Sequence, residues 1–259
     1  MKFSATLALI TLAAAPFTLV HAAEQAPKDS LTIGGGVAVA PEYSGADKNR
    51  ALPLVFVDYQ RADGFFASSF RGLGYQSSVD QLNFSAALAF DAGRKEKREN
   101  IFSGSDKLKG MGDISPSAIA KLGLGYDLGP FSLSMGANLA LTKRDYGNTY
   151  NFGLSMPLNV SKDDTITLSA EASYGDRKHA QTYYGVTAAQ SQRSGYAAYQ
   201  PKGGFEQTEL SVNWMHKVDA HWSVRTLLGV SHLMGDAAKS PLTQKKTTPM
   251  AAATINYTF

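Results

Sequence analysis

Histidine is the residue type in this sequence best suited to metal binding or to acid–base catalysis. The sequence contains no cysteine, no two histidines are spaced as a helical metal-binding pair, and no carboxylate stands at a metal-ligand spacing from them. A Ser-His-acid trio assembles only in space, so sequence order leaves open a hydrolase acting on lipid or lipopolysaccharide. We expect a protein that is not an enzyme and has no catalytic residue, metal or cofactor. The histidines considered are His179, His216, His221 and His232.

Charged and amide side chains at five other positions could serve a different purpose. Each lies in a stretch where polar and apolar residues alternate, on the polar side of that alternation. Such side chains could line a path for small polar solutes or pair with one another across an interior, and we favour pairing. The five candidate lumen-facing residues are Lys121, Glu171, Glu209, Asn213 and Arg225.

The elements that carry these residues are predicted to be β-strands, because apolar residues recur at every second position. In 131–142, phenylalanine, leucine, methionine and alanine share one face, and serine, glycine and asparagine occupy the other. The stretch 251–259 alternates in the same way and places Tyr257 and Phe259 on its apolar face. Further strands are expected at 31–39, 82–90, 114–128, 150–161, 166–174, 210–218 and 222–230.

These strands predict an all-β fold, a transmembrane antiparallel β-barrel. Each is about as long as a tilted strand needs to cross a bilayer, whereas no later run resembles the ~18 or more apolar residues of a spanning helix. Aromatic residues lie near strand ends, as an interfacial belt would place them. A soluble sandwich of ordinary strands is the alternative. The aromatic residues are Phe131, Tyr150, Tyr174, Trp222 and Tyr257.

The connections between strands are of two kinds, as in outer-membrane barrels, which have short periplasmic turns and long outer loops. Counting back from a periplasmic C-terminus places every long connection outside the cell. The short turns lie at 127–130, 161–164 and 218–221, and the long connections at 91–112, 177–204 and 235–248.

The strand count is predicted to be twelve, with ten as the alternative, because such a barrel needs an even number. The region 31–78 prevents a firm count, since 51–59 is apolar on both faces and 65–75 is interrupted by Arg71. If the apolar face containing Leu54 pointed inward, this region could instead be a segment packed within the lumen.

The N-terminal residues have the features of a cleaved secretory signal, namely a short basic start, an apolar run and small residues near 22. We therefore expect a signal peptide at 1–22, a short periplasmic segment at 23–30 and a barrel domain at 31–259. Without cysteine, the exported chain depends on its packing rather than on disulfides. The formal charge of +3 falls to +2 without Lys2, too little to indicate a nucleic-acid partner.

Two local patterns have structural explanations. The glycines at 34–36 are not followed by a nucleotide-binding motif and are expected to permit curvature or close backbone approach. The mixed-charge run 94–99 is expected to be a solvated loop, although its four basic residues could contact lipopolysaccharide.

The chain contains the segments PEYSGAD at 41–47, MGDI at 111–114, YGVTAAQS at 184–191 leading to YQPKGG at 199–204, and SPL at 240–242. Together these segments resemble the MipA/OmpV family of outer-membrane proteins. The resemblance extends from about residue 31 to residue 259, and the segment that runs from 184–191 to 199–204 is the most specific.

The resemblance implies an outer-membrane barrel with no catalytic residues to carry over. Some members are described as scaffolds that bring a murein transglycosylase to a murein synthase, and others as porins or adhesins. We therefore expect a peptidoglycan scaffold, with a porin-like channel or an adhesin as the alternative. Expected partners are outer-membrane lipid, lipopolysaccharide, the barrel assembly machinery and these two murein enzymes.

Two groups of aromatic residues are assigned roles within this interpretation. Tyr257 and Phe259 are expected to form a C-terminal assembly signal. Tyrosines in 184–204 and just before it offer enough ring area to pack into an ordered extracellular loop, which could act as a lid. These loop residues are Tyr183, Tyr184, Tyr196 and Tyr199.

Overall fold

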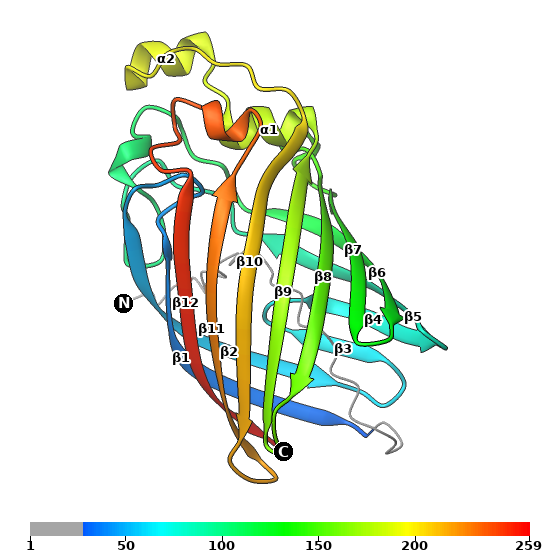
Figure 1. Ribbon diagram of the computed structural model, residues 1–259. Coiled ribbons are helices and arrows are strands. Elements are labelled where there is room, and N and C mark those ends of the chain that lie inside the picture. Colours follow the sequence, from blue (N-terminus) through cyan, green and yellow to red (C-terminus); the bar gives the residue numbers. More distant parts are fainter. Residues whose placement is uncertain (1–27) are drawn as a thin grey trace, which may run out of the picture.

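The computed structural model describes residues 28–259, in which twelve antiparallel strands form one closed barrel (Figure 1). Each strand pairs with its neighbours in sequence, and β1 pairs with β12 to close the ring. The prediction of twelve strands is confirmed. The expected signal peptide at 1–22, and 23–27 of the segment after it, lie outside the described residues. The strands are β1 Ser30–Pro41, β2 Asn49–Gln60, β3 Phe65–Ser68, β4 Gly72–Val79, β5 Leu82–Asp91, β6 Ser117–Leu128, β7 Phe131–Ala140, β8 Thr149–Asn159, β9 Asp164–Gly175, β10 Gly204–Lys217, β11 Trp222–Leu233 and β12 Thr247–Thr258.

Side chains alternate between the two sides of the barrel wall. On β10, Leu210 points outward and is 60% exposed, whereas the neighbouring Glu209 points inward and is 8% exposed. Outward leucine, valine and phenylalanine side chains are exposed on nearly every strand. The barrel is therefore apolar outside and more polar inside, as a lipid-embedded barrel requires.

The strand β12 completes the wall by pairing with both β11 and β1. Its polar face is buried inside the barrel at Asn256, and the backbone N–H of Phe259 donates to the carbonyl of Leu31 at 2.9 Å. Gly36 of β1 lies so close to the backbone of Ala253 that a side chain at this position would collide with it. The expected close approach at 34–36 is thus found at the joint between the first and last strands.

The region that sequence could not resolve contains a long strand followed by a short hairpin. β2 is a full wall strand, so this segment is not a separate plug in the lumen. β3 and β4 form a hairpin whose tip contains Arg71. The Arg71 guanidinium bonds the Asp58 carboxylate at 2.7 and 3.3 Å and the Gln76 side chain at 2.7 Å, and lies 4.1 Å from the ring centre of Phe66.

Replacing Arg71 by methionine should lower the free energy of unfolding by about 2–3 kcal/mol, because Asp58 and Gln76 lose charge-assisted hydrogen bonds. Arg61 is the matched control, since its ion pair with Asp63 is half exposed on both sides. Arg61→Met should cost less than about 1 kcal/mol. Urea unfolding of the barrel in lipid vesicles measures both values, and equal small losses would show that Arg71 does not hold the hairpin to β2.

Several predicted strand boundaries differ from the observed ones by three to six residues, and two of them show why. Ile114 belongs to an isolated bridge with Arg94 rather than to β6, and β10 begins at Gly204, six residues before the alternation becomes clear at Leu210. In the second case pairing with the end of β9 extends the strand through a register shift between Phe205 and Gln207.

The long connections contain the helical elements. Helix α1 (Arg177–Tyr184) begins after Asp176, whose carboxylate accepts the backbone N–H of His179. Helix α2 (Ala188–Ser194) has a reciprocal capping box between Thr187 and Gln190. No helix among residues 28–259 is both long and apolar enough to cross a membrane. Three 3₁₀ turns complete these connections, namely η1 Asp106–Leu108, η2 Arg144–Tyr146 and η3 Ala237–Lys239.

The two ends of the barrel differ accordingly (Figure 1). We call the packed long connections at one end the cap, which comprises 42–48, 92–116, 141–148, 176–203 and 234–246. We call the opposite end the turn rim, which comprises the tight connections 61–64, 80–81, 129–130, 160–163 and 218–221, together with Phe259.

Candidate functional site: the cap, the lumen and the turn rim

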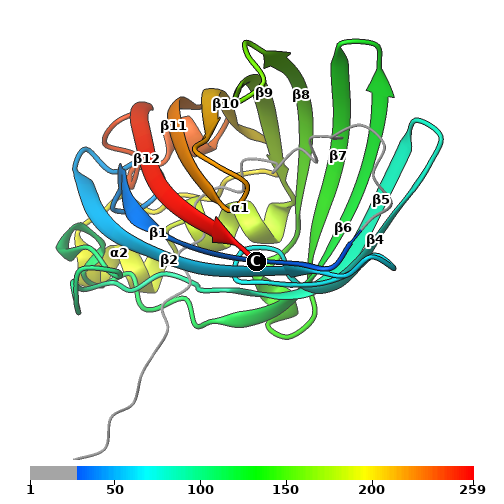
Figure 2. The same cartoon turned by 90° about the horizontal axis from the view of Figure 1, so that it is seen from below.

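Helix α1 lies across the capped end of the barrel, within the outline of the ring when the molecule is seen from the turn rim (Figure 2). On one side the Tyr183 hydroxyl donates to the Asp91 carboxylate of β5 at 3.2 Å. On the other side His179 Nε2 lies 3.2 Å from Glu206 Oε1 of β10. Four strands separate β5 from β10 in one direction around the ring and six in the other. The helix is therefore held by nearly opposite sides of the barrel and spans its opening.

A hydrophobic core formed by four different connections supports this helix. The Tyr196 hydroxyl donates to the carbonyl of Lys107 at 2.8 Å, and the Tyr199 hydroxyl donates to the carbonyl of Asp236 at 2.9 Å. Both rings pack against the core from its edge. Because these contacts join segments far apart in the sequence, the cap is one packed unit rather than a set of independent loops. The core residues are Tyr43, Ala46, Leu108, Met111, Val186 and Leu242.

Tyr184 is the most deeply buried of the four tyrosines assigned to the loop, with 4% exposure. Its hydroxyl lies 2.9 Å from Ser44 Oγ, and its carbonyl accepts the Ser240 hydroxyl at 2.6 Å, so it links α1 to the connections on either side of the β1–β12 pair. Burial raises the pKa of Tyr184 and that of Tyr183 above the ordinary phenol value. Both phenols are therefore neutral hydrogen-bonding groups at physiological pH.

The predicted solvated loop at 94–99 is instead partly fastened into the cap. Arg94 is half-buried, donates to the carbonyl of Tyr183 at 2.7 Å and lies 5.9 Å from the centre of that ring. Loss of solvent around the guanidinium lowers the pKa of Arg94, because it disfavours the charged form. An arginine side chain nevertheless stays protonated in proteins. The Glu96 carboxylate accepts the backbone N–H groups of Gly110 and Gly112 at 2.9 and 2.8 Å. The expectation of a solvated run is thus wrong for these two residues.

The histidines do not assemble into a common site. His179 faces Glu206, His216 Nδ1 lies 2.9 Å from Asp164, and His232 Nδ1 lies 2.7 Å from the Thr247 hydroxyl. His221 Nδ1 lies 2.9 Å from the backbone carbonyl of Thr258. In residues 28–259 no three potential metal ligands cluster, and none of these rings is bonded to both a hydroxyl and a carboxylate.

The structure brings together only two of the five candidate lumen residues. Glu171 and Glu209 are directly opposite in the register of β9 and β10. Lys121 lies on β6 and donates to the carbonyl of Phe70 at 2.9 Å. Asn213 is opposite Thr167 and Leu227, and Arg225 is opposite Met215 and Thr254.

Three of these residues lack the ion pair that the sequence leads us to expect. Across 28–259, no ion pair joins Lys121, Glu171 or Glu209 to an opposite charge. Two contacts between acidic and basic side chains that the sequence pattern does not indicate are Asp58 with Arg71 at 2.7 Å and His179 with Glu206 at 3.2 Å. Only the position of Asp58 among the inward-facing residues of β2 could have indicated that it forms such a contact.

The turn rim presents short, well-bonded turns and a cluster of aromatic rings. The Asp219 carboxylate accepts the backbone N–H groups of Trp222 and His221, which hold the pKa of Asp219 below its usual value. The ring of Tyr257 lies 5.0 Å from that of Trp222 and 4.8 Å from that of Phe259. The two residues assigned to an assembly signal therefore lie where the last strand meets the β10–β11 turn.

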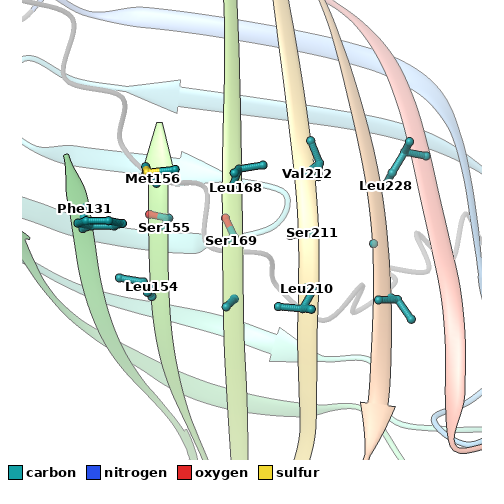
Figure 3. A pocket seen from close by; sticks show the side chains of 13 residues that line it. Phe131, Leu154, Ser155, Met156, Leu168, Ser169, Leu210, Ser211, Val212 and Leu228 are labelled. Atoms are coloured by element: carbon teal, nitrogen blue, oxygen red, sulfur yellow. The ribbon is translucent and has the colours of Figure 1, made fainter. Parts of the chain in front are cut away.

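A shallow apolar groove lies on the outer surface of β8–β11 (Figure 3). Exposed leucine and valine side chains form it, and three serines lie in one row of the same strands. A groove on this side would face lipid chains and offers no group for catalysis. Among its lining residues are Leu154, Leu168, Leu210, Val212, Leu228 and Val230, and the serines are Ser155, Ser169 and Ser211.

A closed antiparallel barrel with an apolar outer face, a more polar inner face, tight turns at one end and long connections at the other defines an outer-membrane β-barrel protein. The solved structure of the COG4313 outer membrane channel from Pseudomonas putida F1 has a similar fold, with a TM-score of 0.52 and 10% identity. The match covers 91% of this chain and 97% of that channel.

The family model described as "MltA-interacting protein MipA" matches residues 33–259, so the chain belongs to the MipA family. The MltA-interacting proteins of Escherichia coli (strain K12) and of Shigella flexneri are each 26% identical to it over 263 aligned residues. Each match covers 98% of this chain and 99% of the relative. The resemblance inferred from the sequence motifs is confirmed.

Proposed function

We propose that this protein is a non-enzymatic outer-membrane anchor that binds a murein transglycosylase at its turn rim. The observation that supports this most strongly is the match along nearly the whole chain to relatives named for their interaction with MltA. In outer-membrane barrels the short turns face the periplasm, where a murein-degrading enzyme meets its substrate. A second partner, a murein synthase, would have to bind the same side.

The cap favours an anchor over an open pore. Helix α1 spans the opening and is bonded to both β5 and β10, and the surrounding connections share a hydrophobic core. A protein whose opening is spanned by a helix can still act by presenting a rigid surface.

The turn rim is small but rigid enough to be recognised. Asp29, just before β1, accepts the Tyr59 hydroxyl and the backbone N–H of Ala62, both at 2.9 Å. These hydrogen bonds join the residue before β1 to the end of β2 and to the turn between β2 and β3. Exposed Arg61 and Lys162 lie on two different turns, close in sequence to Asp63 and Asp163, so these turns present charges of both signs, which guide partner association and specificity.

Reversing these two charges tests the proposal. Arg61→Glu with Lys162→Glu should weaken binding of a purified murein transglycosylase roughly ten-fold, as measured by surface capture of the detergent-solubilised barrel. Lys109→Glu with Lys245→Glu is the matched control, because both lysines are exposed in the cap. An unchanged Kd in the rim variant would contradict docking there, and an equal loss in the control would place the partner on the other face.

A channel for small polar solutes is the second candidate function. Serine, threonine, asparagine and glutamate side chains on the inner faces of β8–β10 favour it, because a water-filled path needs such a lining. This function would require α1 to move away from the opening.

A further inference from the structure

The cap connection between β5 and β6 extends beyond the ring of the barrel. Figure 2 shows the segment 97–109 outside the outline of the strands, on the side of β2. The segment is fastened there by the buried Arg50, whose guanidinium donates to the carbonyl of Gly104. The same guanidinium lies 3.4 Å from the Glu42 carboxylate of the β1–β2 connection. We call the segment 97–109 the overhang.

The overhang is attached at the height where the apolar outer wall of the barrel ends. Val39 of β1 and Phe90 of β5 are exposed outward-facing residues close to the cap ends of their strands. Arg50, which holds the overhang, is the second residue of β2. The long connections of outer-membrane barrels face the outside of the cell. The overhang would therefore lie beside the barrel, at the boundary between the hydrocarbon and the headgroups of the outer leaflet.

Two apolar side chains are exposed at the tip of the overhang. Ile101 is 55% and Phe102 36% exposed. The side-chain oxygen of Asn100 accepts the backbone N–H groups of Phe102 and Ser103, at 2.7 and 3.0 Å, so an ordered turn presents this pair. In the described part of the cap the other exposed large apolar side chain is Leu141, which directly follows β7. An apolar pair that the cap could have buried in its core is thus held facing outward.

Three lysines of the overhang have no acidic partner. Lys97, Lys107 and Lys109 are exposed, and in the part of the chain that the structure describes no ion pair joins them to a carboxylate. The carboxylates in and next to this segment already have other partners. Glu42 contacts Arg50 and Arg98, Glu96 accepts two backbone N–H groups, Glu99 and Asp113 contact Lys95, and Asp106 accepts the backbone N–H of Arg98.

We propose that the overhang binds a phosphorylated glycolipid of the outer leaflet, the chemical class of lipopolysaccharide. The three lysines contact its phosphate groups, and Ile101 and Phe102 insert among its acyl chains. Lysines that extend toward lipid phosphates and an aromatic ring at the membrane interface are the usual way in which a protein segment lies on an anionic membrane.

A soluble acidic protein fits this segment less well. It would satisfy the lysines, but it would have to reach an apolar tip that lies beside the end of the lipid-facing wall. The lipid surface supplies the phosphates and the hydrocarbon together. This inference does not depend on docking at the turn rim.

Native mass spectrometry of the full barrel, released from non-ionic detergent, tests the proposal by counting bound lipid. The probes are a lipopolysaccharide with a short sugar core, phosphatidylglycerol and inorganic phosphate, each titrated separately. The native protein should bind the lipopolysaccharide at least about ten-fold more tightly than either of the others, because several phosphates and acyl chains act together. Equal affinity for phosphatidylglycerol would overturn the assignment to a glycolipid. This comparison needs no variant.

Neutralising the lysines tests the phosphate contacts. Each lysine near an anionic lipid surface strengthens binding about five-fold, so Lys97→Gln with Lys107→Gln and Lys109→Gln should raise the Kd for lipopolysaccharide at least about ten-fold. The matched control removes three exposed lysines from other connections of the cap and should change the Kd less than about two-fold. Equal effects in the two variants would overturn the proposal. The control substitutions are Lys202→Gln, Lys245→Gln and Lys246→Gln.

Removing the apolar tip tests the insertion separately. Ile101→Ser with Phe102→Ser should weaken binding of the intact lipopolysaccharide several-fold. Binding of its deacylated form, which keeps the phosphates and lacks the acyl chains, should stay as in the native protein. An unchanged Kd for the intact lipid, or an equal loss for both forms, would overturn insertion of the tip. Heat-modifiable gel mobility verifies that every variant is folded.

Discussion

Replacing Tyr184 by alanine is expected to open the cap. The ring is almost fully buried, and its hydroxyl and carbonyl contact the connections that contain Ser44 and Ser240. Truncating a buried aromatic side chain costs about 3–5 kcal/mol, and here this cost falls on the cap rather than on the strands. We expect tryptic cleavage within 185–203 to become at least about 100-fold faster, because 1.4 kcal/mol corresponds to a factor of ten.

The control for this prediction is Tyr184→Phe. It keeps the ring and removes only the contact with Ser44, so the cap should lose about 1 kcal/mol. Cleavage of the reconstituted barrels is followed by gel electrophoresis under conditions that leave the strands intact. If both variants were cleaved as slowly as the parent protein, Tyr184 would not hold the cap closed.

Replacing Gly36 by alanine is expected to weaken closure of the barrel. A Cβ at this position would collide with the carbonyl of Ala253 on β12, and a backbone atom cannot move aside as the end of a side chain can. Forcing an extra carbon into a close contact typically costs about 1–3 kcal/mol. Because the contact joins the first and last strands, the loss affects the whole ring, and urea unfolding in lipid vesicles measures it.

The adjacent Gly35 provides a matched control. A Cβ there would meet only the carbonyl of Leu54, at 3.8 Å, which is an ordinary contact. Gly35→Ala should therefore change the free energy of unfolding by less than about 0.5 kcal/mol. A similar loss for both variants would mean that the glycines matter through strand propensity rather than through the β1–β12 contact.

The strand pattern could be predicted because the environment imposes it locally. On β12, Ile255 faces outward and Asn256 inward, and this two-residue period is visible without any knowledge of neighbouring strands. The two-residue period is lost where that environment changes. β2 is apolar on both faces because Leu52 and Leu54 are buried on its inner side, and β3 has only four residues, too few to show a period.

The contacts that hold the cap together and attach it to the barrel could not be predicted in the same way. Arg94 and Tyr183 are 89 residues apart, and so are Lys107 and Tyr196, so sequence spacing gives no sign that they meet. A run of alternating charges such as 94–99 looks solvated until its distant partners are known. The pair between His179 and Glu206 forms where β10 begins earlier than the alternation indicates, and the acidic residue was therefore not recognised as inward-facing.

Ion conductance in a planar bilayer tests most directly whether this protein acts through its surface rather than through its bore. With α1 held by β5 and β10, the intact protein should pass almost no current, and Tyr184→Ala should produce discrete conductance steps under the same voltage and salt. A steady, large conductance from the intact protein, equal to that of the variant, would contradict the closed cap and favour a channel.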